Sequence, residues 1–145
     1  MKWYKKTLHI ATISKGLFPF TEKVQDCLQQ WNIQEGICHL YLQHTSASLI
    51  INENYDPTAK KDMQTFMEQL IPSRQAWMEH TLEGSDDSTS HLRTMLTNVS
   101  LSIPIGNGNL CLGNWQGIYL FEHRSHPHNR RVLLRVLSIE EGEIV

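Results

Sequence analysis

The sequence predicts an α+β fold, in which a mainly antiparallel or mixed sheet packs with two or three helices. Helical patterns alternate with β-rich segments in the first two thirds of the chain, and the last third is almost entirely β. Short turns join many of the strands, as expected for antiparallel pairs. At 145 residues the chain fits a single domain, 1–145, because domains usually have about 100–200 residues.

The first half of the chain contains both helical and β patterns. Leu8 and Ile10 alternate with polar residues and predict a strand. Further on, apolar residues recur at i, i+3, i+4 and i+7, which is typical of one helical face. Asp56 followed by Pro57 predicts a helix start, because the carboxylate can cap free amides and proline suits the first helical position. The expected elements are a strand at 3–13, a turn at 14–16, a helix at 21–32, strands at 37–43 and 48–52, and a helix from 57 to about 72.

The second half begins with a polar, turn-rich segment at 73–90. A loop of this length in a compact domain is more often functional or disordered. Ser88 or Ser90 can cap the short helix that follows. Pro104 places its strand at a sheet edge or at the strand's end, and 106–109 predicts a tight hairpin turn. The expected elements are a short helix with Leu92, Met95 and Leu96, strands at 99–105, 110–112, 116–122 and 131–139, a turn around His126, His128 and Asn129, and a solvated acidic tail at 140–143.

Composition narrows the class of function. A net charge of -2 gives no field that would hold nucleic acid nonspecifically. The first residues lack a signal-peptide pattern and no stretch has 18 consecutive apolar residues, so we expect a cytoplasmic protein without a membrane segment. Cys27, Cys38 and Cys111 lack CxxC spacing. We expect them to be small buried hydrophobes and not a disulfide framework or a zinc module.

The first polar cluster runs from His44 to Pro57. His44 can bind a metal or move a proton; in the alternative, its ring only forms hydrogen bonds with neighbouring hydroxyls. Ser46 and Ser48 offer hydroxyls to a phosphate. Asn52, Glu53 and Asn54 precede a helix start, where they can receive an anionic or polyol ligand or a hard cation, or simply fix the loop by hydrogen bonds.

A second cluster surrounds Asp87 and His91. These residues are four apart, so on a helix they share one face and the carboxylate can orient the imidazole or bind the same cation. In the alternative, Asp86 and Asp87 are only charges facing a helix start. We predict that His44, Asp87 and His91 converge on a divalent metal ion, magnesium or zinc. Structural roles are expected for His9, His39 and His80.

The third cluster lies around Trp115 and at the end of the strand at 116–122. Trp115 stands between two glycines and can stack on a heteroaromatic ligand or fill the core. Glu122 and Arg124 share a strand face. An arginine near a carboxylate suits phosphate recognition, and the alternative is a surface ion pair of little energy.

Four blocks of this sequence together resemble the YjbQ family of small proteins, which is often labelled "secondary thiamine-phosphate synthase enzyme". The resemblance covers nearly the whole chain. Two departures are Asn114, where other members usually have threonine before the tryptophan, and the wording Glu-His-Arg at 122–124, where many members have an aspartate. The matching blocks are QHTSASLIINENYDP (43–57), EGSDDSTSHL (83–92), SIPIGNGNLCLGNWQGIYLFEHR (102–124) and RRV (130–132).

The resemblance implies an α+β subunit of a homotrimer, with a polar site near subunit boundaries. It also implies a weak ability to join hydroxymethylpyrimidine diphosphate to thiazole phosphate, with release of diphosphate. The alternatives are a metal-dependent phosphoester hydrolase and a noncatalytic trimer that binds a metabolite. The expected catalytic residues are His44, Asp87, His91 and Glu122, and the expected substrate-binding residues are Ser46, Ser48, Asn52, Glu53, Asn54, Trp115, Gln116 and Arg124.

Overall fold

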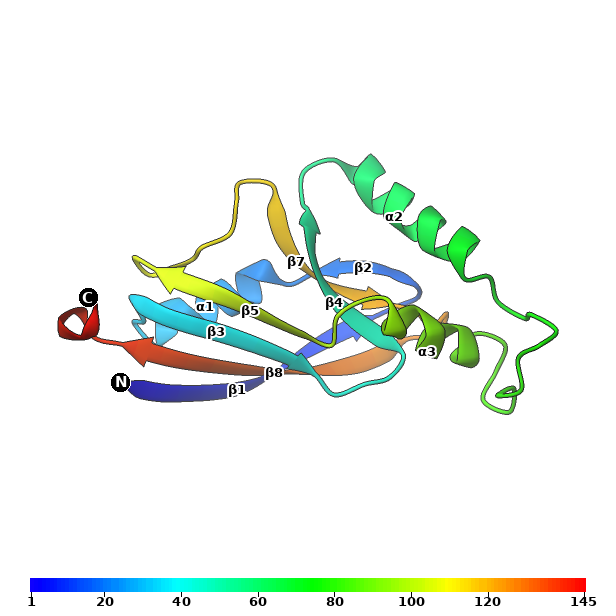
Figure 1. Ribbon diagram of the computed structural model, residues 1–145, viewed down its shortest axis with the longest axis horizontal. Coiled ribbons are helices and arrows are strands. Elements are labelled where there is room, and N and C mark those ends of the chain that lie inside the picture. The colour runs from blue at the N-terminus through cyan, green and yellow to red at the C-terminus, as the bar shows by residue number, and fades with distance from the viewer.

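Two antiparallel sheets and three α-helices form the fold in a computed structural model of residues 1–145 (Figure 1). The strands are β1 (Lys2–Thr12), β2 (Gly16–Pro19), β3 (Glu35–Leu42), β4 (Ala47–Glu53), β5 (Ser100–Gly106), β6 (Asn109–Leu110), β7 (Gln116–Glu122) and β8 (His128–Ile139). The helices are α1 (Thr21–Gln30), α2 (Pro57–Leu70) and α3 (Asp87–Met95), with a 3-10 turn at Glu141–Glu143.

The larger sheet has the strand order β1-β8-β3-β5-β6 and the smaller one the order β2-β7-β4. Every strand pair is antiparallel. Strand β1 pairs with β8 from Lys2↔Ser138 to Thr12↔His128. The expected hairpin turn lies between β5 and β6, where Asn107 and Gly108 have φ angles of 51° and 79°. Positive φ at both central positions is the backbone of a type I′ turn.

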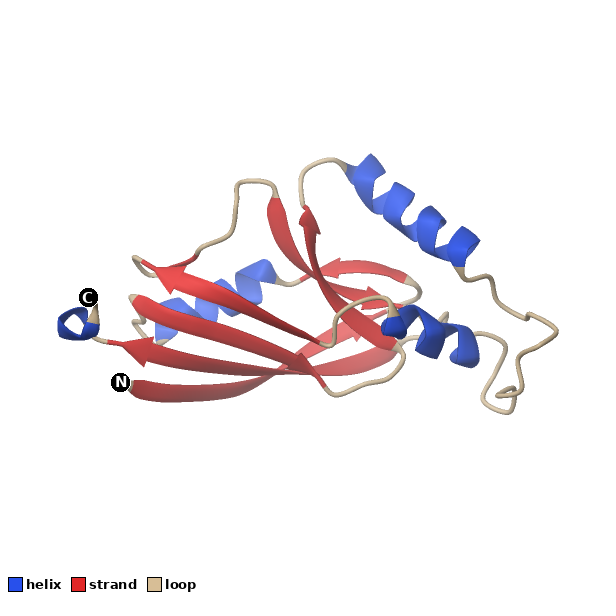
Figure 2. Cartoon of the chain, in the orientation of Figure 1, coloured by secondary structure: helices blue, strands red, loops and turns tan.

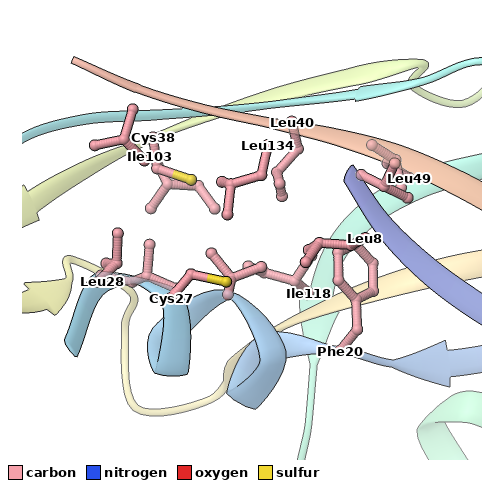
Figure 3. Packing of buried hydrophobic residues seen from close by; sticks show 14 of the residues in the cluster. Leu8, Phe20, Cys27, Leu28, Cys38, Leu40, Leu49, Ile103, Ile118 and Leu134 are labelled. Atoms are coloured by element: carbon pink, nitrogen blue, oxygen red, sulfur yellow. The ribbon is translucent and has the colours of Figure 1, made fainter. Parts of the chain in front are cut away.

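The main core lies between the larger sheet and a layer formed by α1 and the smaller sheet. Figure 3 shows Cys38 and Leu134 of the larger sheet facing Cys27 of α1 and Ile118 of β7. Alternate residues of each strand face this core, as the pleat of a strand requires. The two cysteines are buried and unbridged, as predicted, whereas Cys111 is exposed.

Helix α2 covers the other face of the smaller sheet. Its Met67 packs with Leu17, Tyr119 and Phe121 in a second, smaller core. The helix begins as predicted, because the Asp56 carboxylate accepts a hydrogen bond from the Thr58 backbone amide at 2.9 Å. Between α2 and α3 the chain has no helix or strand from Ile71 to Asp86 (Figure 2), and we call this segment the 71–86 loop.

The predicted α+β class is confirmed, with four corrections to individual elements. The strands form two sheets instead of one, and β2 was not expected. Helix α3 begins at Asp87 and not after Ser88 or Ser90, and the Asp86 side chain makes no capping bond. His128 and Asn129, expected in a turn, belong to β8, where they pair with the end of β1. No helix is both long and apolar enough to cross a membrane.

Candidate functional site

Three side chains meet where the 71–86 loop joins α3. Oδ2 of Asp87 lies 2.8 Å from Nε2 of His80 and 3.0 Å from Nε2 of His91. One ligand atom from each residue lies within 4.8 Å of the other two. Asp87 is buried, while His80 and His91 are partly open to solvent. We call these three residues the His-Asp-His cluster.

Local structure explains this convergence. Asp87 and His91 are four residues apart on α3, so they lie one above the other on the same helical face. The loop carries His80 back onto that face. The prediction that Asp87 and His91 lie together is therefore confirmed, and the third member of the cluster is His80, for which we had expected a structural role.

Hydrogen bonding fixes the orientation of the His91 ring. Nδ1 of His91 lies 2.8 Å from the backbone oxygen of Thr45. A carbonyl oxygen only accepts, so Nδ1 carries the hydrogen and donates it. A neutral His91 therefore directs the lone pair of Nε2 towards Asp87. A backbone carbonyl that orients a histidine in this way is typical of a metal-binding imidazole.

Arg124 fixes the position of both aspartates at the start of α3. Its Nε donates to Oδ1 of Asp86 at 3.2 Å, and its Nη1 donates to Oδ1 of Asp87. Ser125 donates to the other oxygen of Asp86 through its backbone N–H at 2.7 Å and through its hydroxyl at 2.9 Å. With its donors used in this way, Arg124 positions Asp87. This geometry does not favour the phosphate-binding role that was predicted for Arg124.

These contacts keep both carboxyl groups charged. Burial raises the pKa of Asp87, but the hydrogen bond from His80, the contact with His91 and the charge of Arg124 outweigh burial, so the pKa lies below its ordinary value. For Asp86, burial is likewise outweighed by the hydrogen bonds from Ser125 and by Arg124, and its pKa is also lowered. An ionised Asp87 beside two imidazoles is a donor set that suits zinc, manganese or iron.

His44 lies outside the His-Asp-His cluster, contrary to the prediction that it joins Asp87 and His91. Its Nε2 accepts a hydrogen bond from the backbone N–H of Arg131 at 2.9 Å, and its Nδ1 faces Nη1 of Arg130 at 3.3 Å. Burial and the positive charges of both arginines lower the pKa of His44. A neutral ring between two arginines is a poor ligand for a cation.

Glu122, predicted to be catalytic, lies in a buried ion pair. The fully buried Glu122 carboxylate accepts hydrogen bonds from Arg130, with 2.8 Å to its Nε, and from the Thr12 hydroxyl at 2.6 Å. Burial raises the pKa of Glu122, but the Arg130 and Thr12 contacts outweigh it, and the pKa is lowered. No role was predicted for Arg130, although it lies in one of the matching blocks. The role that this geometry favours for Glu122 is structural.

Ser46 and Ser48 are also turned inward. The Ser46 hydroxyl accepts from Nη2 of Arg130 at 3.0 Å, and the Ser48 hydroxyl lies 2.7 Å from Nε2 of His123. Both serines are buried, so neither offers a free hydroxyl to the phosphate that we predicted them to bind.

The remaining predicted residues form a separate group at the other end of the β4–β7 pair. Trp115 is 60% exposed and its ring contacts Tyr55 edge-on at 5.1 Å. The register runs from Ala47↔Glu122 to Glu53↔Gln116. Six residue steps of about 3.4 Å separate these ends by about 20 Å. Within one chain this group does not join the His-Asp-His cluster; its members are Asn52, Glu53, Asn54, Trp115 and Gln116.

Two antiparallel sheets around a main core, with a His-Asp-His cluster at the start of α3, define a small α+β protein with a candidate metal centre. The chain belongs to the UPF0047 protein YjbQ-like family, whose model matches residues 6–139. It is 44% identical over 133 residues to a UPF0047 protein of Synechocystis, which covers 92% of this chain and 90% of the relative. It is 41% identical over 132 residues to the UPF0047 protein YjbQ of Escherichia coli, covering 90% of this chain and 95% of that protein.

Solved structures share the fold. A conserved hypothetical protein from Thermus thermophilus is 32% identical, with a TM-score of 0.81, and the match covers 91% of this chain and 99% of that one. A protein of unknown function from Sulfolobus solfataricus has a TM-score of 0.87 at 22% identity, over 95% of this chain and 99% of that chain, a likeness of fold alone.

Proposed function

We propose that this protein is a divalent-metal-dependent enzyme that acts on a small phosphorylated metabolite at the His-Asp-His cluster. The observation that carries the proposal is the direction of the His91 ring. Because Nδ1 donates to Thr45, the Nε2 lone pair of a neutral His91 faces a charged oxygen of Asp87 at 3.0 Å. These two lone pairs repel each other unless a proton or a metal cation lies between them. A half-buried group of two imidazoles and a carboxylate, oriented by a carbonyl and an arginine, fits a metal cation.

The reaction to test first is the joining of hydroxymethylpyrimidine diphosphate to thiazole phosphate. In this reaction the bond from the pyrimidine methylene carbon to the diphosphate oxygen breaks, and the oxygen keeps the electron pair. The thiazole nitrogen then bonds to that carbon. A bound divalent ion supplies positive charge for the departing diphosphate. The protein contributes the fixed positions of Asp87, held by Arg124, and of His91, held by Thr45.

Hydrolysis of a phosphoester is the second candidate. It is favoured by the number of protein groups, because His80, Asp87 and His91 would hold a divalent ion with only three side chains, and His80 also lines a cavity. Such an ion would lower the pKa of water for attack on the ester. A chelator-sensitive release of phosphate from simple esters would support this candidate over transfer.

We also propose that the protein is a homotrimer, as the family resemblance implies. Support comes from apolar side chains left exposed on one chain. A groove of about 420 Å³ beside α3 includes Trp77, Met95 and Leu96, which are 67%, 77% and 61% exposed. Apolar patches of this kind often mark contacts between proteins. Light scattering after size-exclusion chromatography tests the trimer, and the cytoplasmic location stays a prediction.

The decisive experiment is metal analysis of protein purified without an affinity tag, together with activity assays. We expect about one divalent ion per chain in the wild type, and its loss together with activity in His80→Ala and His91→Ala. His44→Ala separates this site from the one predicted from sequence, because it should keep the ion. His9→Ala, on the exposed side of β1, is the matched control.

The proposed site would be contradicted if His80→Ala and His91→Ala both kept the bound metal and the activity. Melting temperatures close to that of the wild type show that the variants fold, which is expected because both histidines are partly exposed. If the protein binds a metabolite tightly but forms no product with any metal ion tested, the result would support the noncatalytic alternative.

A further inference from the structure

A polar cavity of about 370 Å³ opens beside His80, and residues of the 71–86 loop line it together with Ser88 of α3. Only one of its eight lining residues is hydrophobic. Arg74, Ser85 and Ser88 line it together with His80, so a ligand in the cavity lies next to the His-Asp-His cluster. The carboxylates of Glu79 and Glu83, from the same loop, do not line it.

Arg74 is the only arginine or lysine side chain that lines this cavity. Its Nη2 donates to the Ser85 hydroxyl at 3.3 Å, and it forms no ion pair with a carboxylate. Arg124, in contrast, uses its Nε, Nη1 and Nη2 on Asp86, Asp87 and the backbone oxygen of Glu83. Arg74 therefore retains donors for a ligand, and a guanidinium fork matches a phosphate in geometry and in charge.

We propose that this cavity is a phosphate-binding subsite, in which Arg74 and the hydroxyls of Ser85 and Ser88 hold the phosphate of the substrate. The subsite deepens the proposed function, since it places a phosphate group next to the metal ligands. Arg74 attracts phosphate independently of the metal, so phosphate binding to the subsite does not require a bound metal ion.

Local charge predicts how the metal affects this binding. Without a metal, Arg124 forms ion pairs with both Asp86 and Asp87, whereas Arg74 forms none. A divalent ion in the cluster adds two positive charges close to the cavity. Because a nearby cation attracts an anion most strongly where water is partly excluded, phosphate binds more tightly to the metal-loaded protein.

Calorimetric titration with inorganic phosphate tests the subsite, on protein treated with a chelator and on protein loaded with manganese. We expect phosphate binding in both forms, and tighter binding in the manganese form. Arg74→Gln should weaken binding about tenfold in both forms, because a lost charge-assisted hydrogen bond costs at least that factor. Ser85→Ala should weaken it by a smaller factor.

Matched controls separate this effect from general charge. Arg131→Gln removes an exposed arginine from β8, outside the cavity, and should leave phosphate affinity unchanged. Sulfate, titrated in place of phosphate at the same ionic strength, reports general anion attraction. Arg74 is exposed, so Arg74→Gln should keep the wild-type melting temperature and metal content.

The outcomes distinguish the subsite from the proposed function. Phosphate affinity that is unchanged in Arg74→Gln, or binding that only His80→Ala abolishes, overturns the subsite and leaves the metal centre standing. Absence of phosphate binding up to about 10 mM in both forms, or sulfate binding of the same strength and the same dependence on Arg74, also overturns it. If no metal binds but phosphate still binds through Arg74, the metal-dependent function fails and the subsite stands.

Discussion

Burial of His123 predicts a stability that falls as the pH is lowered from 7 to 5. His123 is fully buried, its Nε2 contacts the Ser48 hydroxyl and its Nδ1 has no hydrogen-bond partner. Burial, together with the positive charge of Arg93, lowers the pKa of His123 from 6.5 to about 3. In the unfolded chain the ring takes up a proton near pH 6.5, whereas in the folded protein it stays neutral until about pH 3.

The sign and size of the effect follow from proton linkage. The unfolded state binds more protons between these two pKa values, so lowering the pH favours unfolding. The contribution of a neutral His123 is complete above pH 6.5 and is lost progressively down to about pH 3. From pH 7 to pH 5 this single residue lowers the free energy of unfolding by about 2 kcal/mol.

Urea unfolding of the wild type and of His123→Leu at pH 7, 6, 5.5 and 5 measures this contribution. Tryptophan fluorescence reports unfolding, and the protein concentration is fixed because assembly would couple to stability. The free energy of the wild type should fall by about 2 kcal/mol more than that of the variant. His44, whose pKa is also lowered, is present in both proteins and cancels in the difference. Parallel curves would refute the reasoning, whatever the absolute stability of the variant.

Two further predictions concern stability. Arg130→Met should lower the free energy of unfolding by about 3–5 kcal/mol, because it leaves the Glu122 carboxylate buried without its partner. The same change at exposed Arg131 should cost less than about 0.5 kcal/mol in the same urea titration; equal costs would contradict the buried pair. Gly36→Ala should cost about 3 kcal/mol or more, because the added Cβ would lie 2.2 Å from the Leu137 backbone oxygen at a φ of 153°. Gly142→Ala, with no atom within 4 Å of its Cβ, should melt like the wild type.

Local signals explain which elements the sequence predicted well. The Asp56 cap and the turn at Asn107 and Gly108 depend only on neighbouring residues, and both occur as expected. Strand β2 was missed because it has only four residues and its pairing of Leu17 with Phe121 joins distant parts of the chain. The division into two sheets was missed for the same reason, because no local sequence pattern shows which strands pair with each other.

The candidate site shows the same division between local and distant contacts. Asp87 and His91 could be paired from their spacing on one helical face. His80 could not, because a loop has no periodicity that gives the direction of its side chain, and the signal available was the length and polarity of that loop. His44 was wrongly predicted to join the cluster. Its ring instead accepts a hydrogen bond from the backbone N–H of Arg131, which is 87 residues away in the sequence.

The position of His80 on the 71–86 loop has a mechanical consequence. An ion bound by all three residues of the His-Asp-His cluster would link residue 80 to α3. The chain segment closed by this link is short, so the entropic cost of closing it is small. Removal of the ion would release the loop. A protease that cuts exposed, flexible segments should therefore cleave the loop faster in the metal-free protein than in the metal-bound protein. The rate of such nicking then reports occupancy of the centre without any knowledge of its substrate.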